Sequence, residues 1–221
     1  MRVIALIVRA GAVVVACAFV FSQLVDGGPK PATAARPDVS AVETPAPKPK
    51  LAAVKKSTGP KIPEGVVAIV ATGDIVMGST PNLPSDGGRS FFSDVETDLA
   101  GDVVLGNLEG TLSTEGGSKC GKGSTNCFAF QTPPSYARWL QGAGFTVMNL
   151  ANNHAYDFGA AGLRQTTDAL AGVGLEWTGR PGQITVQKVG GIRIAVVGFA
   201  PYPWAQSLTD IAAAKKLVRK A

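Results

Sequence analysis

Three short polar stretches of this chain hold most of the side chains that could do chemistry. Each follows an apolar or β-branched run, and they are residues 71–74 (Ala-Thr-Gly-Asp), 105–110 (Leu-Gly-Asn-Leu-Glu-Gly) and 149–154 (Asn-Leu-Ala-Asn-Asn-His). In an α/β sheet the carboxyl ends of neighbouring strands converge on one crevice, where ligands bind. Carboxylates, amide oxygens and an imidazole collected there would suit a hard or borderline divalent metal ion.

The acidic candidates are Asp74 and Glu109. Asp74 follows a glycine at a strand end, where an aspartate can equally bond its own backbone in a turn. Glu109 lies in a loop, where a single glutamate is commonly just solvated. Asn107 could hold the turn before it through its side-chain amide. The metal interpretation therefore depends on the three stretches meeting in space.

His154 is the only histidine of the chain. A single histidine is often a satisfied structural residue. The two residues before it, Asn152 and Asn153, are less ordinary, because they place side-chain oxygens at the mouth of the crevice beside an imidazole that can transfer a proton. Asp157 is interpreted as a helix cap in preference to a ligand.

The hydrophobic pattern predicts strands that are covered on both faces, as in parallel sheets. Two β-branched runs on either side of Gly190-Gly191 indicate a hairpin. The expected strands span residues 66–71, 102–105 and 145–150, and the hairpin arms span 184–189 and 192–197.

Helices are expected between these strands. Pro133-Pro134 indicates the start of one helix, and Ser93 and Asp157 are expected to cap two others. Ile211 should lie on the buried side of the last helix. The expected helices cover residues 94–100, 134–140, 159–171 and 208–220. Strands that alternate with helices predict an α/β layered sheet.

The net charge of +5 belongs to the N-terminal part of the chain. Residues 1–64 contain nine Lys/Arg and four Asp/Glu, whereas residues 65–221 contain twelve of each kind. A nucleic-acid-binding domain carries its basic residues on the folded surface. The neutral remainder therefore argues against nucleic acid as a partner.

The first 26 residues are strongly apolar, and Arg2 and Arg9 favour a cytoplasmic N-terminus. Three interpretations stay open: a single-pass membrane anchor, a cleaved signal peptide with a processing site near Ala32-Thr33-Ala34, and a lipoprotein box ending at Cys17. All three would export the rest of the chain.

The chain is accordingly divided into three parts. Residues 1–26 form the anchor or signal segment, and residues 65–221 form the folded domain. Residues 27–64 contain eight of the fifteen prolines and are expected to be a disordered linker.

Cys120 and Cys127 flank a short polar loop that a disulfide could close. A zinc site is the weaker interpretation, because no neighbouring Cys or His completes a tetrahedral ligand set. A disulfide suits an exported chain.

In their order and spacing, these motifs resemble the CapA family of poly-γ-glutamate capsule synthesis proteins, which is similar to the calcineurin-like metallophosphatases. The resemblance covers the chain from about residue 66 onward and agrees with exported members at residues 128–134. The motifs that carry it are Gly73-Asp74, Gly106-Asn107-Leu108-Glu109, Asn152-Asn153-His154, Asp157 and Gly159.

The resemblance implies a layered α/β/β/α sandwich with divalent metal ions (Mn, Fe, Zn or Mg) at the strand ends. Such ions polarise a phosphoryl oxygen and lower the pKa of a bound water, so the implied activity is phosphoester hydrolysis. The implied roles are metal-binding carboxylates for Asp74 and Glu109, an amide-oxygen ligand for Asn153, the catalytic imidazole for His154, and support behind the ligands for Asn107, Asn152 and Asp157.

The resemblance also implies a membrane-anchored, extracytoplasmic protein of capsule synthesis, with a secreted protein or a lipoprotein as the alternative. Implied partners are an anionic cell-surface polymer or phosphoester substrate, the membrane through the N-terminus, and other capsule synthase subunits. A catalytically inactive accessory subunit is the second functional interpretation. Family members carry further histidines in a second half, whereas no histidine follows His154 here. The expected fold is therefore incomplete at its C-terminus, with only part of the metal ligands.

Overall fold

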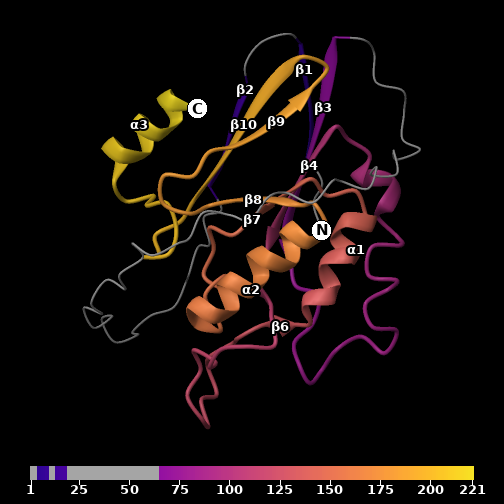
Figure 1. Ribbon diagram of the computed structural model, residues 1–221, viewed down its shortest axis with the longest axis vertical. Helices are drawn as coiled ribbons and strands as arrows, with labels where there is room; N and C mark the ends of the chain where they lie inside the picture. The colour runs from indigo at the N-terminus through magenta and orange to yellow at the C-terminus, as the bar shows by residue number, and fades with distance from the viewer. Residues whose placement is uncertain (1–3, 10–12, 19–64) are drawn as a thin grey trace.

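Two β-sheets pack against each other at the centre of the molecule (Figure 1). The computed structural model describes the backbone of residues 4–9 and 13–18 and all atoms of residues 65–221. The larger sheet has the order β1-β3-β4-β7-β8 and the smaller one the order β2-β10-β9. The strands are β1 Ile4–Arg9, β2 Val13–Ala18, β3 Val66–Ile75, β4 Val103–Leu108, β7 Val147–Asn149, β8 Glu176–Thr178, β9 Thr185–Val189 and β10 Ile192–Phe199.

Four neighbouring strands of the larger sheet, β3, β4, β7 and β8, run parallel, and β1 pairs with β3 in the antiparallel direction. In the smaller sheet β10 is parallel to β2 and antiparallel to β9. A parallel sheet needs crossover connections, which are commonly helices. The carboxyl ends of the four parallel strands therefore lie at the same edge of the larger sheet.

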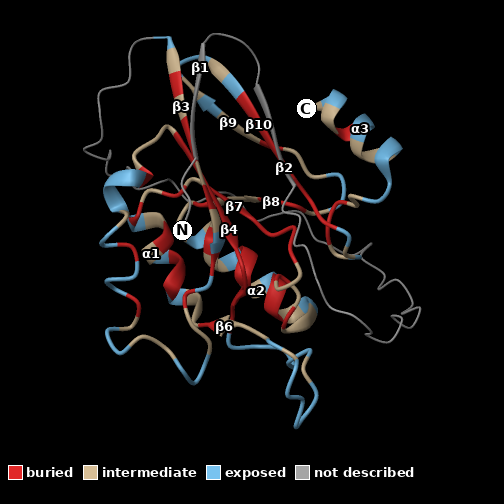
Figure 2. Cartoon of the chain, turned by 180° about the vertical axis from the view of Figure 1, so that it is seen from behind, coloured by how far each residue is buried: buried red, intermediate tan, exposed pale blue. Residues whose placement is uncertain are grey.

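Helices cover the outer faces of both sheets (Figure 1). Helices α1 and α2 pack on the larger sheet, and α3 packs on the smaller one. Figure 2 shows that the buried residues gather in the central strands and on one side of α1 and α2. The remaining elements are α1 Ala137–Gly142, α2 Gly159–Gly172, α3 Ile211–Lys220, the 3₁₀ turns η1 Glu96–Leu99 and η2 Pro134–Tyr136, and the short parallel pair β5 Thr111–Leu112 and β6 Gln131–Thr132.

The alternation of side chains along each strand separates the layers. On β4, Val103 packs between the sheets against Ile194 of β10, whereas Val104 belongs to the core beneath the helices. On β10, Val197 turns outward and packs against Leu217 of α3. This order of helix, sheet, sheet and helix confirms the predicted α/β/β/α layering.

The predicted strands, the hairpin at Gly190-Gly191 and the helix that follows Pro133-Pro134 are confirmed. The predicted helix over residues 94–100 is instead a single 3₁₀ turn, and Ser93 does not cap it, because its hydroxyl bonds the carbonyl of Ser90. Ile211 is 54% exposed, so its expected burial was wrong. It begins α3, whose buried contact with the smaller sheet is made further along the helix by Leu217.

The predicted linker over residues 27–64 lies outside the described residues. Within the first 26 residues the structure describes two strands, β1 and β2, at positions where an apolar helix was considered. No helix among the described residues is both long and apolar enough to cross a membrane.

Candidate functional site

The register of the larger sheet aligns polar residues at the ends of its parallel strands. Asp74 lies opposite Asn107, Asn107 opposite Asn149, and Asn149 opposite Thr178. Two of these residues are fully buried: Asn149 and Thr178 are each 0% exposed. A buried polar group must be hydrogen-bonded, so this row of side chains specifies how the strand ends fit together.

An irregularity in β3 brings Asp74 into this row. Ala71 pairs with Leu105, but Asp74 pairs with Asn107, so three steps along β3 match two steps along β4. Such a bulge adds one residue to a strand and re-aims the side chains that follow it. If β3 kept the regular register from Ala71 onward, Asp74 would lie opposite Leu108, with its side chain on the other face of the sheet.

The side chain of Asn107 joins the two predicted acidic ligands. Its Nδ2 donates to Oδ1 of Asp74 over 2.8 Å and to Oε2 of Glu109 over 2.7 Å. The two carboxylate oxygens therefore lie no farther apart than the sum of these distances. Asp74 is exposed, while Glu109 is only 6% exposed, so the pair extends from solvent into the protein.

Two further asparagines hold the bridging amide. Oδ1 of Asn107 accepts hydrogen bonds from Nδ2 of Asn149 at 2.8 Å and from Nδ2 of Asn152 at 3.0 Å. All four hydrogen-bonding positions of the Asn107 amide are thus used. A fully satisfied buried network is rigid and specific, because any rotation leaves a polar group unpaired.

A glycine of the smaller sheet allows this network to form. A Cβ added to Gly198 of β10 would lie 2.1 Å from Oδ1 of Asn149. The backbone N–H of Gly198 also donates to Oγ1 of Thr178 over 3.2 Å. The smaller sheet therefore packs directly against the polar row, with no room for a side chain between them.

The loop after β7 positions His154. Oδ1 of Asn152 accepts the backbone N–H groups of His154 and Ala155 at 2.9 and 2.7 Å. The imidazole stacks at a tilt of 39° on Phe130, with ring centroids 4.5 Å apart. Its Nε2 lies 3.8 Å from Oε1 of Glu109, so the imidazole and the buried carboxylate face the same space.

Asp157 contacts the other nitrogen of the imidazole and does not cap α2. Its Oδ2 lies 2.8 Å from Nδ1 of His154 and accepts the backbone N–H of Phe130 at 2.7 Å. The N-cap position of α2 is Phe158, which makes no side-chain cap. The predicted cap was wrong, because a partner three residues earlier competes for the same carboxylate.

Glu109 has a strongly perturbed acidity. Burial, the negative charge of Asp74 and, to a smaller extent, that of Asp157 raise the pKa of Glu109 to about 7, against the opposing effects of His154 and Asn107. Perturbed carboxylates of this kind are concentrated at functional sites. A cation bound beside Glu109 would relieve the same electrostatic strain and lower its pKa.

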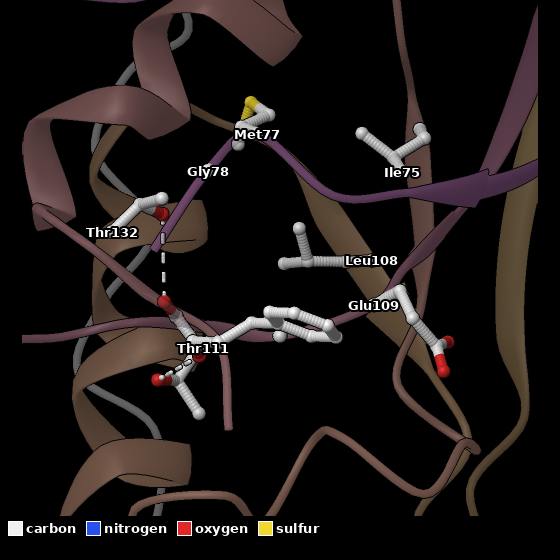
Figure 3. A pocket seen from close by; sticks show the side chains of 9 residues that line it. Ile75, Met77, Gly78, Leu108, Glu109, Thr111 and Thr132 are labelled. Carbon is white, nitrogen blue, oxygen red and sulfur yellow. Dashed lines mark hydrogen bonds between the residues drawn. The ribbon is translucent and has the colours of Figure 1, made fainter. Parts of the chain in front are cut away.

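Glu109 is one of the residues that line a small cavity. Ile75, Leu108, Thr111 and Thr132 are among its lining residues. Figure 3 shows the carboxylate of Glu109 at the opposite end of this group from Thr111 and Thr132. The side chain of Glu109 therefore packs beside mainly apolar residues, and its carboxylate points toward Asn107 and His154.

Aromatic residues after β10 pack beside the site. Trp204 stacks on Tyr156 and on Tyr202, with ring centroids 5.0 and 5.1 Å away, and its Nε1 donates to the carbonyl of Asn152 over 3.0 Å. Burial and the charge of Glu109 raise the pKa of Tyr202. This coupling places Tyr202 within electrostatic reach of Glu109, whereas Trp204 packs between two aromatic rings.

The donor types present suit a divalent cation, but they do not form a complete set within the described part of the chain. Asp74 and Glu109 offer adjacent carboxylate oxygens, which hard cations prefer. No three His, Cys, Asp or Glu side chains of residues 65–221 lie close enough together to hold a metal ion. The carbonyl of Asn153 accepts Nζ of Lys119 at 3.1 Å, and the assignment of its side chain as a metal ligand stays a prediction.

The disulfide predicted between Cys120 and Cys127 is present. The closed loop, residues 120–127, directly follows Lys119, which contacts Asp157. Sequence reasoning missed Lys119, and it gave no role to Asn149. The strand-end position of Asn149 was the available signal, whereas nothing in the sequence around Lys119 indicates its partner.

Comparison with known proteins gives a consistent result. Residues 68–219 match the family described as "Bacterial capsule synthesis protein PGA_cap". The chain is 32% identical over 157 residues to "PGA biosynthesis protein CapA" of Bacillus subtilis (strain 168). The aligned region covers 65% of this chain and 40% of that protein. It is 34% identical over 104 residues to "Capsule biosynthesis protein CapA" of Bacillus anthracis, with coverages of 44% and 25%. The chain thus spans less than half the length of these relatives.

Proposed function

Because the chain belongs to the bacterial capsule synthesis family PGA_cap, we propose that it takes part in making a capsular or related cell-surface polymer of the poly-γ-glutamate type. The names of the two Bacillus relatives support the process. The proposed chemistry is divalent-metal-dependent phosphoester hydrolysis at the strand-end site.

The observation that carries this chemistry is the Asn107 bridge, which holds the carboxylates of Asp74 and Glu109 side by side. In the proposal these carboxylates and the side chain of Asn153 hold a divalent ion. The ion would supply a Lewis acid for a phosphoryl oxygen and an activated water. His154 is the group that would hold or deliver a proton beside it, because its Nε2 lies 3.8 Å from Glu109.

The test is hydrolysis of bis(p-nitrophenyl) phosphate by chelator-treated protein, with and without added Mn²⁺, Zn²⁺ or Mg²⁺. We expect metal-dependent hydrolysis that is lost in Asp74→Asn and His154→Gln. Asp168→Asn is the matched control, because Asp168 is an exposed residue of α2. Equal rates in all variants, or no rate with any metal, would rule out this chemistry.

A non-catalytic role is the second candidate, and α3 favours it. The helix carries four exposed cations and no acidic residue; they are Lys215, Lys216, Arg219 and Lys220. A polyanion such as poly-γ-glutamate would be attracted to this helix. In this case polymer binding should weaken with salt and in Lys215→Gln/Lys216→Gln, and it should survive Asp74→Asn.

We further propose that residues 1–26 export the chain and hold it at the membrane, so that residues 65–221 act outside the cytoplasm. The support is the apolar run with Arg2 and Arg9 at its start. The disulfide agrees with an oxidising compartment. Localisation of a tagged chain to the membrane fraction, resistant to high salt, is the expected result.

A further inference from the structure

Lys119 reaches from a surface loop to a carboxylate in the protein interior. Its Nζ lies 2.6 Å from Oδ1 of Asp157, and its backbone N–H donates to the carbonyl of the same residue over 2.7 Å. Nζ also donates to the carbonyl of Asn153. The lysine is therefore fixed at three points, although its side chain is 33% exposed.

Among the described residues, Lys119 is the only group that compensates Oδ1 of Asp157. Asp157 is 0% exposed, and its Oδ1 has no hydrogen-bond partner among the described residues. Its Oδ2 is engaged by the N–H of Phe130 and by Nδ1 of His154. A buried carboxylate requires a partner of opposite charge, and here a residue outside the strand-end motifs supplies it.

The contacts of Asp157 bear on which nitrogen of the imidazole donates. Oδ1 of Asp157 faces the ammonium group of Lys119, which only donates hydrogen bonds, and Oδ2 accepts the N–H of Phe130, so the carboxylate is placed as an acceptor. With Nδ1 of His154 as the donor to Oδ2, Nε2 faces Glu109 as the acceptor nitrogen. At metal sites, a partner that fixes the tautomer and the orientation of a histidine also raises the basicity of its other ring nitrogen.

We propose that Lys119 is a positioning residue, which holds His154 through Asp157 in the Nδ1–H tautomer with Nε2 directed at Glu109. The disulfide between Cys120 and Cys127 helps to keep Lys119 in place, because it restricts the conformations of the loop that directly follows Lys119. The effect of Lys119 on catalysis rests on the proposed hydrolytic function, whereas its effect on the tautomer of His154 can be tested separately.

Nuclear magnetic resonance of ¹⁵N-histidine-labelled protein is the test, since His154 is the only histidine and gives one pair of ring nitrogen signals. The variants are Lys119→Met, Lys119→Arg and the double variant Cys120→Ser/Cys127→Ser. Lys122→Met is the matched control, because Lys122 lies in the same loop, is exposed, and forms no ion pair with the described residues.

In the unaltered protein and in Lys122→Met we expect one nitrogen in the protonated range and one in the unprotonated range. Lys119→Met should give averaged signals of two tautomers, and Lys119→Arg should restore the original pattern. The double cysteine variant should give partial averaging. If Lys119→Met proves unfolded by its melting curve, the double cysteine variant, which keeps the lysine, provides the same readout.

Unchanged nitrogen signals in folded Lys119→Met would overturn the proposal. The phosphoester hydrolysis assay distinguishes a failure of the proposal for Lys119 from a failure of the proposed hydrolytic function. If the signals depend on Lys119 but no variant hydrolyses a phosphoester, the positioning stands and the hydrolytic function fails. If both hold, Lys119→Met should lower the rate by roughly 10- to 100-fold, the range seen when partners behind metal-site residues are removed.

Discussion

Asp74 of β3 lies directly opposite Asn107 of β4, and Nδ2 of Asn107 donates to Oδ1 of Asp74 over 2.8 Å. The pairing exists because one extra residue in β3 shifts the register before Asp74. The same amide nitrogen donates to Glu109. One neutral side chain thus determines the separation of two carboxylates, and the predictions below begin with its removal.

Asn107→Ala should destabilise the protein by about 2–4 kcal/mol, because one N–H of each of the buried amides of Asn149 and Asn152 loses its acceptor. Chemical unfolding followed by circular dichroism measures this loss. Gln187→Ala is the control, since Gln187 is a half-buried amide on β9 that makes no side-chain hydrogen bond to a described residue. A loss in Asn107→Ala no larger than in the control would contradict the bridging role.

Gly198→Ala should disrupt the same network from the smaller sheet. The added Cβ would lie 2.1 Å from Oδ1 of Asn149, closer than any real contact, so β10 or the asparagine must move. We expect a loss of about 2 kcal/mol or more, as in overpacked cores. Gly142→Ala places a Cβ in open space at the end of α1, and it should change the free energy of unfolding by less than about 1 kcal/mol.

Metal-free protein should lose stability as the pH rises from 4.5 to about 7. The folded state raises the pKa of Glu109 from 4.5 to about 7, so in this window the folded state binds more protons than the unfolded state does. The free energy of unfolding therefore falls with rising pH and levels off above pH 7. The expected fall is about 2 kcal/mol, after allowance for partial solvent screening.

Denaturant titrations across this pH range measure the slope. Glu109→Gln should flatten it, whereas Glu115→Gln, at an exposed glutamate paired with Arg164, should leave it unchanged. Saturating divalent cation should also flatten the slope, because the bound ion favours the ionised carboxylate. A slope that persists in Glu109→Gln would assign the pH dependence to another group.

Deletion of residues 1–26 decides between two incompatible positions of this segment. A segment in the bilayer cannot also supply β1 beside β3 and β2 beside β10. If the segment is an export anchor, as proposed, the shortened chain should leave the membrane fraction and keep its melting temperature to within a few degrees. A much lower melting temperature would show that β1 and β2 are needed for the fold.

Local patterns predicted the strands of the larger sheet and the polar residues that follow them, whereas the α/β/β/α layering came from the resemblance to the family. Apolar runs marked β3, β4 and β7, and the rule that ligands bind at the carboxyl ends of parallel strands selected Asp74 and Glu109. The bridging role of Asn107 could not be predicted, because it depends on the β-bulge between Ala71 and Asp74 of β3. Gly73 alone is too weak a signal to predict a bulge there.

The errors and omissions come from competing partners. Asp157 has the position of a helix cap, yet the nearby His154 and the distant Lys119 engage its carboxylate. Lys119 was missed because it lies 38 positions before Asp157, and in the chain between them only the disulfide hints at a fixed loop. Ser93 found a nearer acceptor in the turn before it. Spacing rules describe which local hydrogen bonds a residue can form, but they do not account for other groups that compete for the same side chain.

The central claim is that Asp74 and Glu109 together hold a divalent ion, and the most direct test is Mn²⁺ binding to metal-free protein. Electron paramagnetic resonance of the free ion gives the bound fraction at each concentration. The account predicts saturable binding by the unaltered protein and by Asp168→Asn, weakened at least about tenfold in Asp74→Asn and in Glu109→Gln. Equal binding by all four proteins, or no binding by the unaltered one, would contradict it.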